Sequence, residues 1–377
     1  MERTKYGVIV ETLRKEILSG KWSSNPASFP SERALVRRFG VSRPTISQAL
    51  QELRGQGYLL RQQGSGTFLT RSAQRIGGAI GLIVPGNCYA EIFPPICHEI
   101  SRLAQERGMS VVLGDVTSSS AETRARQVVS IARKFAADRV AGIIYQPTEL
   151  VAKVEDLNRG ALKILDDAEV PVVVIDWDFV PSPLRSTYDL VGIDNFDAGR
   201  LLARHMIDRG AKQLRFLIKP NSAFSIRKRV LGAKSCVPYA DKVEVTIDVS
   251  SKEEVSKLLK RRPRPDALIC GNDTLAAHLL VTLRKLGVKV PDEVMVAGFD
   301  DVQHASLVVP SLTTIHQPCV EIARKAFDVL LARIVNPKAP VCAHYLPAPL
   351  VVRESTARKD FPKQNKRRKA KGNAEGD

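Results

Sequence analysis

Hydroxyl and guanidinium groups are concentrated around residue 43, at the beginning of a stretch with helical periodicity. Ser42, Arg43 and Thr45 would lie in the first turn of a helix that begins there, and Arg33 would begin the helix before it. An arginine can donate two parallel hydrogen bonds to guanine in the major groove, while hydroxyls and a second arginine suit phosphate oxygens. These residue types at this spacing therefore predict contacts with double-stranded DNA.

The surrounding sequence supplies the elements that would position these side chains. Apolar residues recur at helical spacing before and after them, and Gly40-Val41 marks a tight turn between two short helices. A Gly-rich turn containing Gln63 and Gly64 then joins two short strands, and its glycines would let the backbone approach DNA closely. The expected elements are helices over residues 6–20, 31–39 and 42–55 and strands over 58–61 and 67–69. This order predicts a winged helix-turn-helix.

Four motifs within residues 6–70 resemble the GntR-type winged helix-turn-helix family. They are FPSER at 29–33, VSRPT at 41–45, ALQEL at 49–53 and GSGTF at 64–68. In that family the matching positions bind DNA. The resemblance therefore implies this role for Arg33, Ser42, Arg43, Thr45 and Gly64, and Gln63, which precedes Gly64, is a further candidate DNA contact. Ser47 departs from the pattern, because the family commonly has a basic residue there. The departure implies either a lost contact or a changed operator preference.

Positive charge is concentrated at the two ends of the chain. The net charge is +17, and residues 1–76 carry 13 Lys and Arg against 5 Glu. Residues 356–377 carry 8 Lys and Arg against 3 acidic residues and almost no apolar ones, so we expect a disordered basic tail. A basic N-terminal module on a nearly neutral body is typical of a nucleic-acid-binding domain attached to a domain with another role.

Residues 79–355 alternate between apolar strands and amphipathic helices. Residues 80–84 and 172–175 are apolar throughout, as expected of strands that are covered on both faces. The expected strands are 79–84, 110–114, 141–145, 172–176, 190–193, 214–218, 242–246, 267–270 and 294–299. This rhythm predicts an α/β fold with parallel sheets and helices on both sides.

Motifs along the same stretch resemble the LacI/GalR-type effector domain, which is itself akin to periplasmic sugar-binding proteins. They include LVGIDN at 190–195, SIRKR at 225–229, PDALICGND at 265–273, GFDD at 298–301 and PSLTTI at 310–315. The resemblance implies two Rossmann-like lobes joined by three crossovers, with an effector in the cleft where strand ends converge. The expected domains are a winged helix-turn-helix over 1–70, a linker over 71–78, lobe 1 over 79–187 and 315–340, and lobe 2 over 188–314 and 341–355.

Polar residues at the strand ends of lobe 2 suit a polyol, whose hydroxyls need paired acceptors and donors. The resemblance places Arg229, Asn272 and Asp300 in the pocket, and Asp273 adjoins them. Asp273 could instead cap the helix that begins at Thr274.

The candidate effector contacts in lobe 1 follow its strands. They are Asn87, Tyr89, Glu91 and Phe93 after the first strand, Gln146 after the third, and Asp176 and Trp177 at the end of the fourth. Trp177 and Phe93 could instead pack in the core of the lobe. Residues 87–93 also depart from the Asn-Pro-Phe-Phe pattern that is common in the family.

Enzymatic, metal and membrane roles find no support in the sequence. The histidines form no HExxH motif and there is no GxSxG motif, so we expect no catalytic residues, no metal site and no cofactor. No apolar run reaches the ~18–20 residues of a membrane-spanning helix, and the polar N-terminus lacks a signal-peptide pattern. The six scattered cysteines have no CxxC pair and are expected to be reduced.

Together these patterns predict a cytoplasmic, homodimeric transcription regulator that represses carbohydrate-utilisation genes. It would bind operator DNA and be released or re-tuned by a sugar-like effector held between the lobes, with no membrane partner. The alternatives are a solute-binding protein, or a regulator that responds to a non-sugar ligand such as a nucleobase. In the latter case the ligand could act as a corepressor, or the protein could be an activator.

Overall fold

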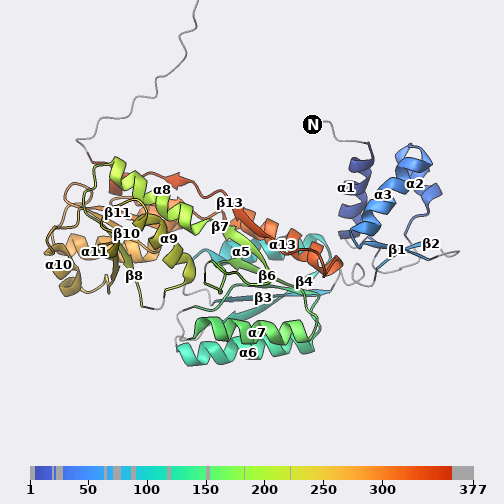
Figure 1. Ribbon diagram of the computed structural model, residues 1–377, viewed down its shortest axis with the longest axis horizontal. Coiled ribbons are helices and arrows are strands. Elements are labelled where there is room, and N and C mark those ends of the chain that lie inside the picture. Colours follow the sequence, from blue (N-terminus) through green and yellow to red (C-terminus); the bar gives the residue numbers. More distant parts are fainter. Residues whose placement is uncertain are drawn as a thin grey trace, which may run out of the picture.

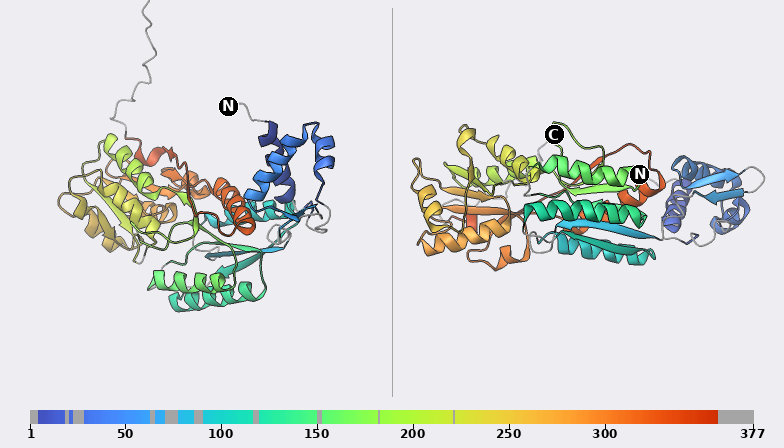
Figure 2. Two further views of the ribbon diagram at one scale, coloured as in Figure 1. Left: turned by 45° about the vertical axis from the view of Figure 1, so that its right-hand side comes forward. Right: turned by 90° about the horizontal axis from the view of Figure 1, so that it is seen from below.

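The computed structural model describes residues 5–18, 21–22, 29–62, 66–70, 78–85, 91–116, 120–149, 153–181, 183–220 and 222–358. It contains an N-terminal helical domain, which we call the head (residues 5–70), and two α/β lobes (Figure 1). The head lies beyond lobe 1, at the end of the molecule opposite lobe 2 (Figure 2). None of the helices among these residues is long and apolar enough to cross a membrane.

The head has the expected winged helix-turn-helix order. Its elements are α1 (Lys5–Leu18), α2 (Glu32–Phe39), α3 (Arg43–Gly55), β1 (Leu59–Gln62) and β2 (Gly66–Leu69). The strands pair antiparallel, with Leu59 opposite Leu69. Buried Leu13, Leu35 and Leu50, from one helix each, form the core together with other apolar residues of the same faces.

Lobe 1 is a six-stranded parallel sheet with the strand order β13-β7-β6-β5-β3-β4. Its strands are β3 (Ala79–Pro85), β4 (Ser110–Val116), β5 (Gly142–Tyr145), β6 (Val172–Asp176), β7 (Asp189–Ile193) and β13 (Ala343–Leu346). Helices α6 (Ala121–Ala137) and α7 (Val154–Asp167) cover one face, and α5 (Phe93–Glu106) and α13 (Cys319–Val335) cover the other (Figure 1). Because both faces are covered, the central strands are apolar throughout.

Lobe 2 is a second six-stranded sheet with the order β14-β12-β11-β10-β8-β9, in which only β14 runs antiparallel to its neighbour. Its strands are β8 (Leu214–Ile218), β9 (Glu244–Thr246), β10 (Ala267–Cys270), β11 (Met295–Asp300), β12 (Thr313–His316) and β14 (Leu350–Val351). Its helices are α8 (Asn195–Asp208), α9 (Phe224–Lys234), α10 (Lys252–Leu259), α11 (Asp273–Lys285) and α12 (Gln303–Leu307), with 3-10 turns η2 (Ala240–Lys242) and η3 (Glu354–Thr356).

The strand pairing shifts the lobe boundaries from the expected positions. We expected residues 188–193 and 341–346 in lobe 2, but β7 pairs with β6 and β13 pairs with β7, so both segments complete the sheet of lobe 1. Conversely, β12 pairs with β11 in lobe 2 although residues from 315 onward were expected in lobe 1. The chain therefore crosses between lobes after β7, after β12 and between β13 and β14.

The ordered part of the chain also extends past the expected start of the tail. Thr356 is buried, and its hydroxyl oxygen lies 2.8 Å from that of Thr313. Arg358 donates to the carbonyl oxygens of Pro291 and Asp266, each at 3.1 Å. Residues 356–358 are therefore packed against lobe 2, and the rest of the predicted tail lies outside the described residues.

Candidate functional site

The turn between α2 and α3 presents three of the candidate DNA contacts. Arg43 begins α3 with 80% of its side chain exposed, and its Nε donates to Glu32 Oε2 at 3.2 Å. Ser42 is the N-cap residue, but its hydroxyl lies 2.9 Å from the Thr45 hydroxyl and makes no cap hydrogen bond to the backbone. Both hydroxyls therefore lie beside Arg43 at the start of α3.

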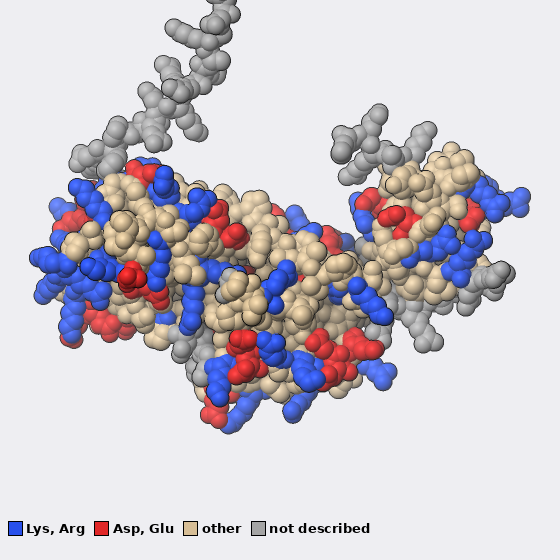
Figure 3. Space-filling model, in the orientation of Figure 1, with Lys and Arg blue, Asp and Glu red and all other residues tan. Residues whose placement is uncertain are grey.

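Local sequence explains this geometry. The Ser31 hydroxyl caps α2 by accepting from Ala34 N at 3.3 Å, and Gly40 ends that helix with a φ of 62°, a conformation that glycine adopts without strain. Arg33, in the first turn of α2, is exposed like Arg43. Basic side chains project from the head on the face drawn in Figure 3. Gln63 and Gly64 lie outside the described residues.

Polar residues from both lobes meet where the parallel strands end. Asp176 ends β6 of lobe 1, and Asp300 ends β11 of lobe 2. Gln317 follows β12 at a crossover, and its Nε2 donates to Asp176 Oδ1 at 3.2 Å. Asp176 and Asp300 have φ values of 71° and 108°, which non-glycine residues rarely adopt and which are concentrated at functional sites.

Arg229 supplies a buried positive charge to this cluster. Its side chain is 4% exposed, and its guanidinium donates to Asn195 Oδ1 at 2.8 Å, to the Gly271 carbonyl at 2.9 Å and to Asp300 Oδ1 at 3.4 Å. The α8–α9 packing fixes its backbone, because a Cβ on Gly199 would lie only 2.0 Å from the Arg229 carbonyl oxygen. Arg229 is thus held rigidly beside Asp300.

Electrostatic coupling links these groups and adds one that the sequence did not indicate. Burial raises the pKa of Asp176 to about 6, against the opposing effect of Arg229. Burial likewise raises the pKa of Glu149 to about 7, and Asp176 raises it further. The pKa of Asp300 is raised by burial and lowered in part by Arg229. Glu149, Asp176, Asp300 and Arg229 therefore share one poorly solvated site, which we call the inter-lobe cluster together with Gln146 and Gln317.

Several polar atoms at this site lack partners. Gln146 Oε1, Gln317 Oε1 and Trp177 Nε1 are buried without a hydrogen bond to any residue that the structure describes. Buried polar atoms are nearly always hydrogen-bonded in folded proteins, so atoms left unpaired in a cleft mark positions for a ligand or ordered water. The two acceptors and one donor match the hydroxyl groups of a polyol.

A hollow of about 380 Å³ opens beside the cluster, between the lobes. Lobe 1 lines this hollow with Glu149, residues 153–156 and Trp177, and lobe 2 lines it with residues 222–224 and Arg227. The ring of Trp177 packs edge-on against Phe224, with centroids 5.6 Å apart. Of the inter-lobe cluster, Glu149 lines this hollow.

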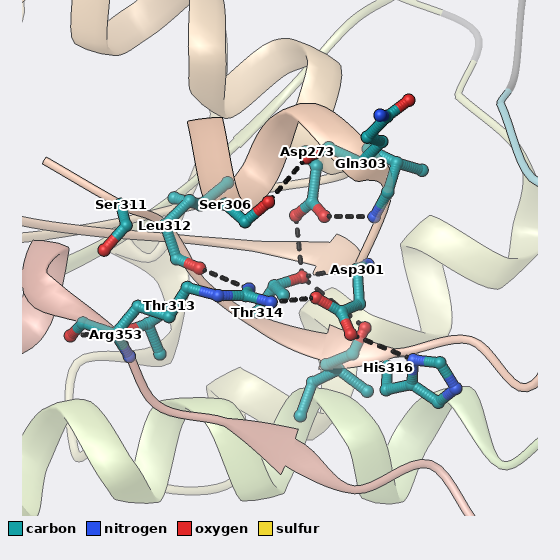
Figure 4. Close-up of polar contacts among 12 residues, drawn as sticks. Asp273, Asp301, Gln303, Ser306, Ser311, Leu312, Thr313, Thr314, His316 and Arg353 are labelled. Atoms are coloured by element: carbon teal, nitrogen blue, oxygen red, sulfur yellow. Dashed lines mark hydrogen bonds and ion pairs between the residues drawn. The ribbon is translucent and has the colours of Figure 1, made fainter. Parts of the chain in front are cut away.

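The remaining sequence candidates have other positions. Asn272 is the N-cap of α11, with its Oδ1 accepting from Leu275 N at 2.9 Å. Asp273 is buried and accepts from Thr314 Oγ1 at 2.7 Å and from Val302 N at 3.2 Å (Figure 4). Burial raises its pKa to about 8. Asp273 thus joins α11 to β12 and to the loop after β11, and the alternative of a structural role describes it better than a ligand contact.

Three candidates of lobe 1 also make contacts within the protein. Phe93 is buried in the first turn of α5, in agreement with the alternative that it packs in the core of the lobe. Glu91 makes a polar contact with His304 of lobe 2, with its Oε1 2.9 Å from Nδ1, and so connects the two lobes. Trp177 is 2% exposed and packs against Phe224, and its Nε1 has no hydrogen-bond partner in the described part of the chain. Asn87 and Tyr89 lie outside the described residues.

Sequence reasoning missed Glu149 and Gln317. Gln317 lies two residues beyond the PSLTTI motif at 310–315, and Glu149 lies three residues beyond Gln146 in the loop after β5. The position of each after a sheet strand was the available signal. No group of three or more His, Cys, Asp or Glu among the described residues could hold a metal ion.

Two family models match the chain. The model for bacterial regulatory proteins of the gntR family matches residues 5–69, and the model for a periplasmic binding protein-like domain matches residues 203–356. These matches coincide with the head and with most of lobe 2 and the last part of lobe 1.

Similar proteins cover nearly the whole chain. An arabinose metabolism transcriptional repressor of Geobacillus stearothermophilus is 29% identical over 370 residues, which are 93% of this chain and 97% of the relative. The ribose operon repressor of Escherichia coli K12 is 28% identical over 266 residues, 68% of this chain and 76% of that protein. Such relatives are transcription regulators and not enzymes.

A solved structure supports the two-lobed fold. The LacI family transcriptional regulator from Enterococcus faecalis V583, solved with bound ribose, has a TM-score of 0.61 and 24% identity, and the match covers 74% of this chain and 98% of that one. The chain is therefore a transcription regulator that combines a winged helix-turn-helix domain of the GntR family with a periplasmic binding protein-like domain of the LacI-regulator fold.

Proposed function

We propose that this protein is a sequence-specific repressor of carbohydrate-utilisation genes, released from its operator by a sugar-like effector bound between the lobes. The observation that carries the proposal is the inter-lobe cluster, in which Gln146, Trp177 and Gln317 have buried polar atoms with no hydrogen-bond partner among the described residues. The head on the same chain, with Arg43 and Arg33 exposed at the helix-turn-helix, provides the DNA contact. The similarity to repressors of arabinose metabolism and of the ribose operon supports the proposal that the effector is a sugar.

The cluster is suited to recognising hydroxyl groups. Carboxylates of Asp176 and Asp300 accept hydrogen bonds, while Gln146 and Gln317 combine acceptors and donors on their amides. Trp177 and Phe224 supply an apolar wall for the face of a ring. Because contacts come from both lobes, the ligand would stabilise the closed arrangement of the lobes over the open one.

Helix α13 is a direct physical route from the effector to the head. Its N-terminus follows Gln317 at the inter-lobe cluster, and its C-terminus ends at Val335 beside the head. There a Cβ on Gly57 would lie 3.2 Å from the Val335 carbonyl oxygen. We infer that closure of the lobes moves α13 and thereby changes the position of the head relative to DNA.

We further propose that the protein acts as a homodimer in the cytoplasm, where its operator lies. Two heads would then read the two half-sites of a pseudo-palindrome. Lobe 2 supports the dimer with exposed apolar side chains, namely Val281 on α11, Leu307 on α12 and Val309, the last 78% exposed. Contiguous exposed apolar patches mark interaction surfaces, so these side chains are the proposed dimer contacts.

The proposal is tested by screening arabinose, ribose and nucleobases for thermal stabilisation of the purified protein and for release of operator DNA. A bound ligand raises the melting temperature because it binds only the folded state. We expect a sugar to do both. Stabilisation by nucleobases alone, or tighter operator binding in the presence of the ligand, would contradict the proposed effector or the proposed direction of its effect.

A further inference from the structure

We propose that Glu149 contacts the effector and selects an uncharged polyol against a phosphorylated sugar. This inference rests on the proposed function and specifies the ligand of the same site. Glu149 follows β5 by four residues and lies where the inter-lobe cluster meets the hollow between the lobes. It was not among the contacts that sequence motifs indicated.

The carboxylate of Glu149 has no partner among the residues that the structure describes. It makes no hydrogen bond or ion pair with any residue in the described ranges, although it is partly buried and borders the hollow. By comparison, the nearby Glu155 and Glu91 are paired with Arg159 and His304. A partly buried carboxylate without a protein partner is costly, which is expected where a ligand completes its hydrogen bonds.

The charge balance around Glu149 disfavours an anionic ligand. Three carboxylates, those of Glu149, Asp176 and Asp300, influence one another electrostatically. The cations that act on Glu149 are Arg229 and Arg124. Arg229 already donates to Asn195, to the Gly271 carbonyl and to Asp300, so its positive charge is largely committed. Lys153 and Arg227 also line the hollow, but both side chains are exposed to solvent. At the buried end of the hollow, a phosphate would meet three carboxylates against two arginines, one of which is already committed.

Hydroxyl groups fit the same surroundings. Each can donate to one of the carboxylates and accept from an amide such as that of Gln146 or Gln317, without adding charge. Burial raises the pKa of Glu149 to about 7, so its ionised form needs a hydrogen-bond donor. A hydrogen bond to an ionised carboxylate is stronger than one to a neutral acceptor, so a neutral hydroxyl stabilises ionised Glu149, whereas an anion repels it. It is therefore a specificity-determining residue and does not need to hold the lobe together.

The test compares ribose and arabinose with their 5-phosphates by isothermal titration calorimetry, on wild-type protein and on Glu149→Gln. We expect wild type to bind the better neutral sugar at least about tenfold more tightly than its phosphate. In Glu149→Gln the neutral sugar should bind about tenfold more weakly while the phosphate binds no more weakly than before, so the ratio falls. Glu253→Gln, on the exposed face of α10, is the control and should keep the wild-type ratio.

Two results would overturn the inference while leaving the proposed function intact. One is a sugar phosphate that binds wild type as tightly as the neutral sugar and releases operator DNA. The other is a ratio in Glu149→Gln that equals the wild-type ratio. If neither sugars nor their phosphates bind and a nucleobase releases the operator instead, the proposed function fails and this inference fails with it.

Discussion

Replacing Asp300 by Asn should make the free protein at least as stable and yet insensitive to effector. Burial raises the pKa of Asp300 against the opposing effect of Arg229, so ionising its carboxyl costs more free energy in the folded protein than in the unfolded chain. Asn removes that charge and also tolerates the backbone, since the φ of Asp300 is 108° and Asn adopts positive φ more readily than most residues. Arg229 keeps its bonds to Asn195 and to the Gly271 carbonyl. The melting temperature should therefore equal or exceed that of wild type.

Effector binding should change in the opposite direction. A hydrogen bond to a charged group contributes about 1.5–3 kcal/mol, so its loss should weaken the sugar by about 10-fold to 150-fold. Operator affinity without sugar should stay close to wild type, because the head makes the DNA contacts. The assays are thermal unfolding of the free protein and fluorescence-anisotropy titration of an operator complex with sugar.

The neighbouring Asp301 provides a matched control. Its carboxylate pairs with Arg353 at 2.6 Å and with His316 at 3.0 Å, within the network of Figure 4. Asp301→Asn should cost about 1–3 kcal/mol, a drop of ~2–4 °C in melting temperature for each kcal/mol, and should leave sugar affinity within a few-fold of wild type. A destabilised Asp300→Asn protein with normal sugar affinity would refute the reasoning, because Asp300 would then be structural like Asp301.

Three further predictions concern DNA, pH and the tail. Arg43→Ala should weaken operator binding by ~1–3 kcal/mol and relax the preference at one base pair, whereas the exposed Arg126→Ala on lobe 1 should not; an unchanged footprint would contradict this. Burial raises the pKa of Asp176 to about 6 and that of Glu149 to about 7, so ionisation of each group lowers the free energy of unfolding. The melting temperature of the Asp176→Asn/Glu149→Gln protein should therefore exceed that of wild type by an amount that grows from pH 5 to pH 8. A difference that shrinks with rising pH would contradict the raised pKa values. Residues 359–377 contain seven Lys and Arg against three acidic residues, so deleting them should reduce the non-specific affinity for DNA and the salt dependence of DNA binding. The preference for operator over random DNA should persist, which titrations of both duplexes at several salt concentrations would measure.

The head could be predicted almost completely because its signals are local. The Ser31 cap, the Gly40 turn and the apolar spacing each act within a few residues, and every helix and strand of the head formed within two residues of its expected bounds. The central strands of the lobes were equally accessible, since a strand that is buried on both faces is apolar along its length.

Strand order and pocket chemistry were less accessible because they depend on tertiary contacts. The local sequence of residues 188–193 and 341–346 does not indicate which sheet these segments join. They belong to lobe 1 because β7 pairs with β6 and β13 pairs with β7. Asp273 has the residue type of a sugar contact, but its carboxylate accepts a hydrogen bond from Thr314, which is 41 residues away in the sequence. Glu149 can be recognised as a site residue only in the folded protein, where Asp176 and Asp300 lie close enough to affect its pKa.

The most direct test of the account is release of operator DNA by sugar. A duplex selected from a random pool by the wild-type protein would be titrated with arabinose and with ribose, while anisotropy reports the bound fraction. We predict that one of these sugars dissociates the wild-type complex and that the Asp300→Asn complex persists at the same concentration. Unchanged anisotropy in wild type up to saturating sugar, or equal release from both proteins, would contradict the claim that the inter-lobe cluster senses the effector.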